Sequence, residues 1–274
     1  MPLYVVATPI GNLGDLTRRA GEVLAACDAV IAEDTRHSGK LLEHLGLSKP
    51  FISLPAFDEA ARVEPIVRRL REGASLALVT DAGTPAISDP GALLVRRAVE
   101  EGVQVIPVPG PSAAVAAVSV SGFVEGRFHF AGFLPRKVSH RDEMLAELLP
   151  LRAQLVFYEA PQRLHETLLT LRAALGDRQA LVARELTKLH EELARGTLSQ
   201  LAQHFAGEVR GEVVIAVSGA GEEAPPQDPT ALEAEVRARL ARGERPKEIA
   251  EALSGDHPKR AVYQLALKLK ADEG

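Results

Sequence analysis

The chain of 274 residues has one cysteine and no tryptophan. Cys27 alone cannot form an internal disulfide, which excludes a disulfide scaffold and is typical of a protein of the reducing cytoplasm. No stretch of about 18 consecutive apolar residues occurs, so no membrane span is predicted. The formal net charge is −5, from 32 Lys and Arg against 37 Asp and Glu. The chain as a whole therefore lacks the positive field of a general nucleic-acid or membrane binder.

Several motifs of cofactor and nucleophile chemistry are missing as well. No Gly-x-Gly-x-x-Gly follows a predicted strand, which disfavours a nucleotide-dependent oxidoreductase. The sequence has no Gly-x-x-x-x-Gly-Lys-Ser/Thr phosphate loop and no Gly-x-Ser-x-Gly nucleophile elbow. Its eight histidines are scattered, and no Cys and His set has zinc spacing, so no metal site is predicted.

What is present is an alternation of short apolar runs with amphipathic segments, in a composition that is 46% apolar and 25% charged. Over the first part of the chain the pattern predicts strands at 3–7, 29–32, 51–54, 76–80 and 103–108, and helices at 16–27, 36–45, 59–72, 91–101 and 112–120. Strands that alternate with helices of this length predict βαβ units and a mostly parallel sheet. We expect an N-terminal α/β domain over residues 1–121.

The segment 121–126 breaks this rhythm and is the expected domain boundary. After it, the pattern predicts strands at 127–133, 154–158, 180–184 and 212–217, and helices at 138–149, 162–175 and 198–205. These elements predict a second α/β domain over residues 122–219, with longer and partly mixed strands.

A Pro-, Gly- and Glu-rich linker is predicted over 220–230, followed by a helical tail over 231–274. Helical patterns cover 231–241, 247–253 and 259–270, with a tight turn at 254–257. From Arg242 to Lys270 we count seven Lys and Arg against four Asp and Glu. A short helix, a turn and a basic helix resemble a helix-turn-helix, while a solvated helical cap would have the same pattern. Contact with nucleic acid therefore stays open for this tail.

Four loops in the first domain follow predicted strands, where parallel sheets bind their ligands. The loops at 8–14 and 107–114 are rich in Gly and Pro, which suits either tight turns or the close approach of a flat ligand. The loop at 80–91 holds two Gly, two Pro, two Asp and three hydroxyls. Since a surface turn needs only one or two such residues, we expect this loop to hold a small polar ligand by its main chain.

The fourth loop places Glu33, Asp34, Thr35, Arg36 and His37 side by side. Asp34 or Thr35 could simply cap the following helix. Capping needs only one of these residues, however, so we favour a polar wall of a functional site. In that reading, the planar guanidinium of Arg36 binds a phosphate.

Basic side chains follow three strands of the second domain. They are Arg136, Lys137, Arg163, Arg184 and Lys188. Each could lie in a solvated turn. Together at one sheet edge they would form a basic cleft floor that holds a phosphodiester chain.

Seven segments carry a family resemblance, in order along the chain: LYVVATPIGNLGDLT, AEDTRHSGKLL, LVTDAGTPAISDPG, VPGPSAAVAA, FAGFLPRK, FYEAPQRL and ARELTKLHEE. From about Leu3 to Ser218, the chain resembles the tetrapyrrole-methylase superfamily. It is most similar to the superfamily's bacterial branch of ribosomal RNA small subunit methyltransferase I. The tail resembles the helix-turn-helix extension of many members.

The resemblance implies a two-domain α/β fold of the class III methyltransferase type, with S-adenosylmethionine bound in the cleft between the domains. The family's Gly-Asp-Pro loop matches Gly83, Thr84 and Pro85, with Thr84 in place of the Asp, as in the ribosomal branch. The other residues implied to line the cofactor site are Pro9, Ile87, Ser112, Ala113, Tyr158 and Ala183. The implied reaction is 2′-O-methylation of a decoding-centre cytidine of 16S rRNA in the 30S subunit, by a cytoplasmic homodimer.

A 2′-hydroxyl is a poor nucleophile, so a base should help remove its proton. The candidates are Glu33, Asp34 and Glu185, with His37 a weaker one. Arg36, Lys137 and Lys188 would hold phosphates or stabilise the developing oxyanion. The expected RNA-binding residues are Arg36, Arg136, Lys137, Arg163, Lys188, Lys259 and Arg260. Two alternatives stay open, a methyltransferase that acts on a tetrapyrrole and a non-catalytic RNA-binding assembly factor.

Overall fold

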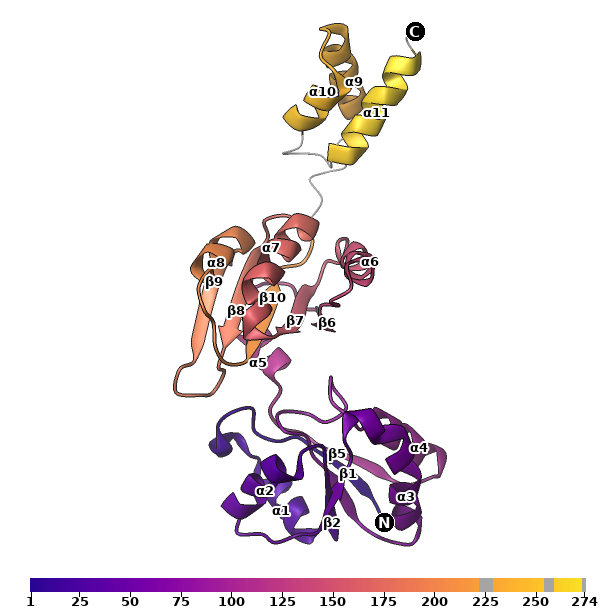
Figure 1. Cartoon of the computed structure of the whole chain (residues 1–274), viewed down its shortest axis with the longest axis vertical. Helices are drawn as coiled ribbons and strands as arrows, with labels where there is room; N and C mark the ends of the chain where they lie inside the picture. Colours follow the sequence, from indigo (N-terminus) through magenta and orange to yellow (C-terminus); the bar gives the residue numbers. More distant parts are fainter. Residues whose placement is uncertain (222–228, 254–258, 273–274) are drawn as a thin grey trace. The chain divides into compact units, whose positions relative to one another are not determined.

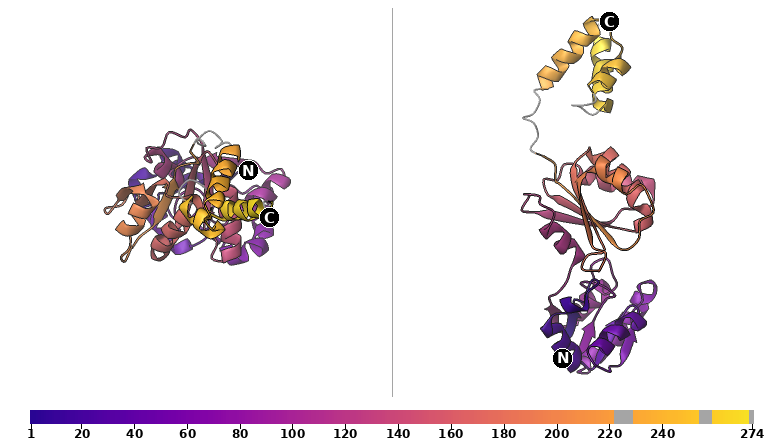
Figure 2. Two further views of the ribbon diagram at one scale, coloured as in Figure 1. Left: turned by 90° about the horizontal axis from the view of Figure 1, so that it is seen from above. Right: turned by 90° about the vertical axis from the view of Figure 1, so that its left-hand side faces the viewer.

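The computed structural model describes residues 1–221, 229–253 and 259–272, with the backbone alone for 229–231, 259–261 and 271–272. The chain divides into two compact units, Met1–Gly219 and Ala220–Gly274. The first unit contains two five-stranded sheets, each with its own helices, as Figures 1 and 2 show.

The first sheet has the order β3-β2-β4-β1-β5, and all of its strand pairs are parallel. Its strands are β1 (Leu3–Val6), β2 (Ala29–Ala32), β3 (Phe51–Ser53), β4 (Leu76–Leu78) and β5 (Val105–Val108). The predicted parallel sheet is thus confirmed. Because all five strands run the same way, their carboxyl ends meet at one edge, and the four polar loops of the sequence leave from that edge.

Helices cover both faces of this sheet, which is why its strands are apolar throughout. They are α1 (Arg18–Ala26), α2 (Thr35–His44), α3 (Glu59–Arg71) and α4 (Ala92–Glu100), with the short 3-10 turns η1 (Leu13–Asp15) and η2 (Ala56–Asp58). Ile66 of α3 and Leu94 of α4 pack with Ile31 on one face. Leu24 of α1 and Leu42 of α2 pack with the residues of the other face.

The second sheet has the order β6-β7-β10-β8-β9 and is mixed, as predicted. Strands β6 (Phe128–Phe133) and β7 (Gln154–Glu159) pair in parallel, whereas β8 (Gln179–Arg184), β9 (Glu192–Thr197) and β10 (Val213–Val217) pair antiparallel. The sequence prediction missed β9. Its Glu, Arg and Gly residues obscure the strand pattern, and charged side chains are common on an edge strand.

Helix α5 (Ala113–Ser119) follows β5 of the first sheet but packs on the second one. Its Ala114 and Ala117 lie in one apolar cluster with Val156, Leu181 and Val214. The opposite face is covered by α6 (Val138–Leu148), α7 (Leu164–Leu175) and α8 (Leu198–His204), with the 3-10 turn η3 (Pro161–Arg163) before α7. The predicted boundary after residue 121 stays a prediction.

The second unit contains α9 (Pro229–Ala241), α10 (Pro246–Ala252) and α11 (Lys259–Asp272), close to the three predicted helices. Val236, Ile249 and Val262 are among the apolar residues of its core. Pro246 begins α10, as expected of proline at a helix N-terminus. The predicted turn at 254–257 and most of the predicted linker lie outside the described residues.

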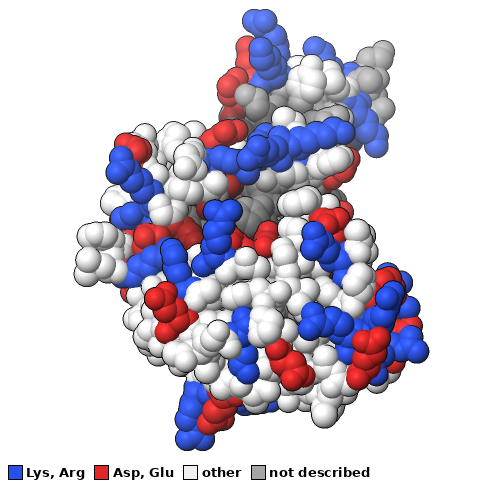
Figure 3. All heavy atoms as spheres, turned by 60° about the horizontal axis from the view of Figure 1, so that its bottom comes forward, with Lys and Arg blue, Asp and Glu red and all other residues white. Residues whose placement is uncertain are grey.

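Among the described helices, none has both the length and the apolar character needed to cross a membrane. Charges of both signs are mixed on the face of the molecule drawn in Figure 3. This mixture agrees with the small net charge of −5.

Candidate functional site

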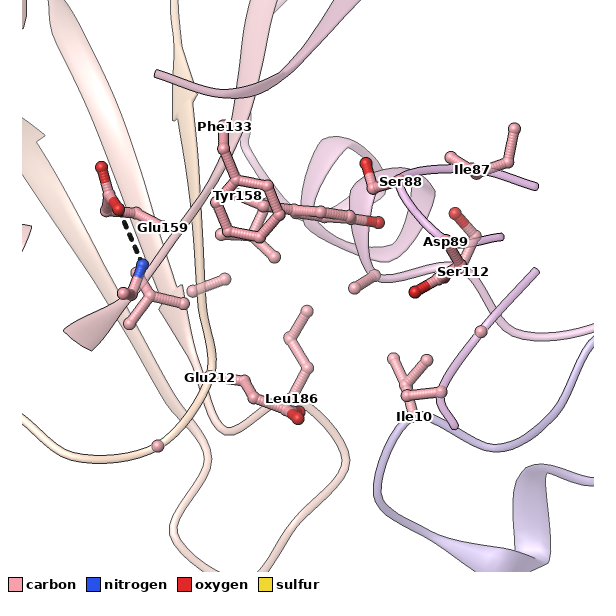
Figure 4. A pocket seen from close by; sticks show the side chains of 18 of the residues that line it. Ile10, Ile87, Ser88, Asp89, Ser112, Phe133, Tyr158, Glu159, Leu186 and Glu212 are labelled. Carbon is pink, nitrogen blue, oxygen red and sulfur yellow. Dashed lines mark hydrogen bonds between the residues drawn. The ribbon is translucent and has the colours of Figure 1, made fainter. Parts of the chain in front are cut away.

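A pocket of about 340 Å³ lies within the first unit and takes its lining from both sheets. Figure 4 shows its interior, where Tyr158 and Phe133 of the second sheet face the loop that carries Ser88 and Asp89. Its lining residues are Ile10, Ala82, Gly83, Thr84, Ile87, Ser88, Asp89, Ser112, Ala113, Phe133, Tyr158, Glu159, Ala160, Pro161, Ala183, Leu186, Gly211, Glu212, Val213 and Val214.

The loop at 80–91 is tied to the end of β1 by main-chain hydrogen bonds. The N–H of Thr8 donates to the carbonyl of Gly83 at 2.8 Å, and the N–H of Gly83 donates back to Thr8 at 3.1 Å. Gly83 has a φ of +82°, a left-handed conformation that suits glycine. The Thr84 hydroxyl donates to the carbonyl of Pro111 at 3.4 Å, which connects this loop to the one at 107–114.

Two non-glycine residues of the same loop also adopt left-handed conformations, Ala86 at φ 65° and Ser88 at φ 67°. Such conformations persist only where surrounding contacts hold them, and they concentrate at functional sites. The far end of the loop is held by Glu59, whose Oε1 accepts hydrogen bonds from the N–H groups of Gly91 (2.9 Å) and Leu93 (3.1 Å). The loop is therefore preorganised around the pocket.

Aromatic rings form the opposite wall. Tyr158 makes edge-to-face contacts with Phe130 at 4.8 Å and with Phe133 at 5.8 Å between ring centroids. Burial raises the pKa of Tyr158 and the negative charge of Asp89 raises it further, against the opposing effects of the Ala114 N–H and the Ser112 hydroxyl. Tyr158 therefore stays a neutral phenol near pH 7. This wall suits the apolar and aromatic parts of a ligand.

Glu159 is a buried carboxylate with a full set of partners. Its Oε1 accepts a hydrogen bond from the N–H of Ala160 at 2.8 Å and pairs with Arg163 Nη1 at 3.2 Å. Its Oε2 accepts a 2.6 Å hydrogen bond from the Thr167 hydroxyl. Because Glu159, Ala160 and Pro161 all line the pocket, these bonds fix the shape of the wall after β7.

The loop after β8 forms another side of the pocket, through Leu186. Lys188 Nζ lies 2.8 Å from Glu185 Oε1 and 3.0 Å from Glu212 Oε2. The hydrogen bond from Lys188 lowers the pKa of Glu185, and the N–H of Glu212 lowers it further. Glu185 is therefore held as an ionised carboxylate whose proton affinity is weak.

Glycines allow neighbouring loops to come close to this ion-paired group. A side chain at Gly211, which has a φ of +90°, would collide with the carboxylate of Glu185. A Cβ at Gly11 would lie 2.5 Å from Cγ of Lys188. The loop at 8–14 therefore meets the loop after β8 only because residue 11 has no side chain.

Carboxylates gather where β2 and β4 end. Burial raises the pKa of Glu33, and the charges of Asp81, Asp89 and Asp34 raise it further. Burial also raises the pKa values of Asp81 and Asp89. Asp34 differs, because its Oδ1 caps α2 by accepting a 2.8 Å hydrogen bond from the Arg36 N–H, and this bond lowers its pKa.

Seven of the nine predicted cofactor residues line the pocket: Gly83, Thr84, Ile87, Ser112, Ala113, Tyr158 and Ala183. The other two lie next to lining residues. Pro9 precedes Ile10 and is half-buried, while Pro85 follows Thr84 and is buried.

The predicted catalytic residues are not gathered in one place. Glu33 is half-buried beside Asp81 and Asp89, outside the pocket lining. Asp34 caps a helix, and Arg36 is exposed in the first turn of that helix. The carboxylate of Glu185 forms an ion pair with Lys188. Lys137 is exposed, at the residue before α6.

The predicted RNA-binding residues divide into paired and unpaired side chains. Arg163 pairs with Glu159, Arg184 with Glu192 at 2.8 Å, and Lys188 with two carboxylates. Within the part of the chain that the structure describes, the exposed Arg36, Arg136 and Lys137 make no ion pair. The side chains of Lys259 and Arg260 lie outside the described residues. The predicted basic floor is thus partly neutralised by its neighbours.

The sequence analysis did not identify several of the lining residues, among them Phe133, Glu159 and Glu212. It predicted the loop that contains Asp89 as a ligand site but did not single out Asp89 itself. Phe133 and Glu159 end strands and could have been found by extending the strand-end rule to the second sheet. Glu212 precedes β10, and β10 runs antiparallel to β7 and β8. Its starting end therefore meets their carboxyl ends, which sequence alone does not indicate.

Over the described residues, no group of three or more His, Cys, Asp or Glu side chains is arranged to hold a metal ion. The pocket instead combines apolar walls, main-chain groups and a few hydroxyls and carboxylates. Such a lining suits an organic ligand with a flat apolar part and a polar end.

Residues 2–202 match the family described as Tetrapyrrole (Corrin/Porphyrin) Methylases. The ribosomal RNA small subunit methyltransferase I of Synechocystis sp. is 43% identical over 275 residues, which cover 98% of this chain and 99% of that protein. The protein of the same name from Xylella fastidiosa (strain Temecula1) is 50% identical over 225 residues, 81% of this chain and 82% of that one.

Two solved structures share the fold at low sequence identity. The crystal structure of diphthine synthase has a TM-score of 0.61 at 16% identity and covers 80% of this chain and 90% of its own. The crystal structure of the methyltransferase CobJ has a TM-score of 0.61 at 18% identity. The match covers 80% of this chain and 94% of that one. The expected α/β fold of the class III methyltransferase type, with small helices after it, is confirmed.

Proposed function

This chain belongs to the tetrapyrrole (corrin/porphyrin) methylase family, and from that membership we propose that it methylates ribosomal RNA of the small subunit. The observation that carries the proposal is the 43% identity to a ribosomal RNA small subunit methyltransferase I over 98% of this chain. We further propose that the product is a 2′-O-methylated cytidine of the decoding centre, made on the 30S subunit by a cytoplasmic homodimer.

Methyltransferases of this family use S-adenosylmethionine, which supplies a methyl group activated on a sulfonium ion. The pocket suits this molecule. Ile10, Tyr158 and Leu186 offer apolar surface for an adenine ring, and Gly83 lines the pocket without a side chain. Ser112 and Ser88 offer hydroxyl groups for the ribose and the amino-acid end.

The chain's own residues would contribute mainly by positioning. The tied loop at 80–91 and the bonded turn after Glu159 hold the pocket walls in fixed places before any ligand binds. Aligning acceptor oxygen, methyl carbon and sulfur can supply ~7–11 kcal/mol of the barrier reduction. A sulfonium methyl group is already reactive, so alignment and proton removal are the tasks left to the protein.

We propose Glu33 as the base that removes the 2′-hydroxyl proton. Glu33 would take the proton of the 2′-hydroxyl as bound S-adenosylmethionine supplies the methyl group to that oxygen. A base is most effective when its pKa approaches the working pH, and the pKa of Glu33 is raised whereas the pKa values of Asp34 and Glu185 are lowered. Arg36, Arg136 and Lys137 are exposed and are proposed to contact phosphates.

The test is methyl transfer from labelled S-adenosylmethionine to purified 30S subunits of a strain that lacks this gene, beside naked 16S rRNA. The product is then mapped by nuclease digestion. Label at one 2′-O-methylcytidine would support cofactor, chemistry and acceptor together. Transfer to a corrinoid or porphyrin, with none to RNA, would instead favour the tetrapyrrole alternative. Light scattering of the purified chain tests the proposed homodimer.

A further inference from the structure

Resting on the proposed function, we propose that Asp89, backed by Asp81, recognises the exocyclic amino group of the acceptor base. This pair would form a specificity subsite beside the methyl-donor pocket, where carboxylate oxygens accept hydrogen bonds from the amine. Asp89 lines the pocket and Asp81 is half-buried beside it.

Sheet topology brings these carboxylates to one place. β2 and β4 are neighbours in parallel register, with Ile31 opposite Leu78. Glu33 and Asp81 therefore leave the sheet side by side at the same edge. The loop at 80–91 then brings Asp89 close to Glu33 and Asp81. The negative charges of Asp81 and Asp89 both raise the pKa of Glu33.

Unused hydrogen-bonding groups lie at the same edge. Thr80 is 3% exposed, and its hydroxyl has no hydrogen-bond partner within 3.5 Å among the described residues. Oδ1 of Asp81 is also buried without a partner there. The Thr80 hydroxyl is close enough to Asp89 to lower the pKa of Asp89. Buried polar groups are nearly always paired, so these atoms are donors and acceptors that the described residues leave unsatisfied at an edge we propose for a polar ligand.

The position of the carboxylates Glu33, Asp81 and Asp89 indicates that their polar ligand is the methyl acceptor and not the methyl donor. Of the clustered carboxylates only Asp89 lines the pocket, so a molecule confined to the pocket leaves Asp81 unused. The rest of the edge continues towards the exposed side chains of Arg36 and His37. A second molecule that approaches along this edge can reach both Asp81 and Asp89.

Charge determines which part of an RNA can bind there. Clustered carboxylates repel phosphates, so the group they accept must be an N–H or O–H donor. Carboxylates accept from the amino group of cytosine, whereas uracil presents a carbonyl at the same position and would be repelled. The exposed Arg36 beside the cluster is free to bind the phosphate that the acids exclude.

The experiment compares 30S subunits that carry either C or U at the methylated position. Wild type is expected to prefer C by about 10–100-fold in kcat/KM. Asp89→Asn keeps the shape of the side chain but adds N–H donors, which can pair with the uracil carbonyl. We expect this variant to reduce the preference to within about threefold. Asp81→Asn should reduce it in the same direction.

The matched control is Glu22→Gln. Glu22 is an exposed carboxylate on α1, a helix that covers the same sheet, and it pairs with Arg18. Binding of S-adenosylhomocysteine by calorimetry and thermal melting are measured for every variant. Donor affinity within twofold of wild type, with a reduced C-to-U preference, supports the subsite. An unchanged preference in both Asp variants, or a weaker donor affinity with equal losses on C and U, overturns it. Absence of RNA methylation by wild type would instead refute the proposed function.

Discussion

The Thr167 hydroxyl of α7 donates a 2.6 Å hydrogen bond to Oε2 of Glu159, and both residues are buried. The other oxygen of Glu159 holds the Ala160 N–H and the guanidinium of Arg163. A residue at the end of β7 is thereby locked to the helix behind it. These contacts hold the wall of the pocket after Tyr158 in place.

Glu159→Ala is therefore expected to lower the free energy of unfolding by about 3 kcal/mol, because it leaves a buried hydroxyl without its acceptor and a partly buried guanidinium without its counter-charge. Thr167→Val should cost about 1–2 kcal/mol. Urea unfolding of the two single variants and the double variant measures their coupling. If the two effects simply add, the hydrogen bond contributes no coupling and this account of the wall is wrong.

Gly211 offers a test of close packing at the pocket. Gly211→Ala places a methyl group against the carboxylate of Glu185 and forces a residue at φ +90° that prefers negative φ. We expect a loss of ~1–3 kcal/mol in unfolding free energy and about tenfold weaker binding of S-adenosylhomocysteine. The control is Gly207→Ala, since nothing lies within 4 Å of a Cβ built there. Equal binding by both variants would contradict the role given to Gly211.

Much of this fold follows from local patterns in the sequence. The strand at 29–32 and the helices of the first sheet lie within two residues of the predicted ends, because each helix amphipathic pattern is long and each strand is buried on both faces. β9 could not be found in this way, since an edge strand has one open side and tolerates Glu192 and Arg195.

The site was only partly predictable for a different reason. Gly83, Thr84 and Ser112 lie in loops that follow strands, and strand ends of a parallel sheet can be located from sequence. The ion-pair partners of charged residues cannot be located in the same way. Lys188 looks like a free cation in the sequence, yet it pairs with Glu212, which is distant along the chain and comes near only in the folded sheet.

Asp34 caps α2, which is the simpler of the two interpretations that its loop allowed. Its cap on α2 predicts that Asp34→Ala lowers the unfolding free energy by about 1 kcal/mol, whereas Asp34→Asn keeps it within about 0.5 kcal/mol, since Asn caps as well as Asp. Thermal or urea unfolding of both variants distinguishes them. Equal destabilisation by Ala and Asn would show that the charge of Asp34, and not its cap, matters for stability.

The carboxylate cluster makes a prediction about pH. Burial and like charges raise the pKa of Glu33, so as a base it becomes active only above the ordinary range of a carboxyl group. The acidic limb of kcat/KM should therefore rise with pH through this raised pKa. Asp81→Asn removes one of the negative charges, which makes ionisation of Glu33 easier. Its acidic limb is expected at lower pH than in wild type.

Stability should respond to the same charges with a defined sign. A carboxyl whose pKa is raised by folding destabilises the folded state once it ionises, so the penalty is absent at pH 3 and complete above the raised pKa. Asp81→Asn should therefore be more stable than wild type at pH 7.5, and this gain should vanish at pH 3. Urea unfolding at both pH values measures the difference, with Glu22→Gln as the exposed control. A gain that is equal at both pH values would mean that the amide stabilises by packing or hydrogen bonding, and that the cluster carries no electrostatic penalty.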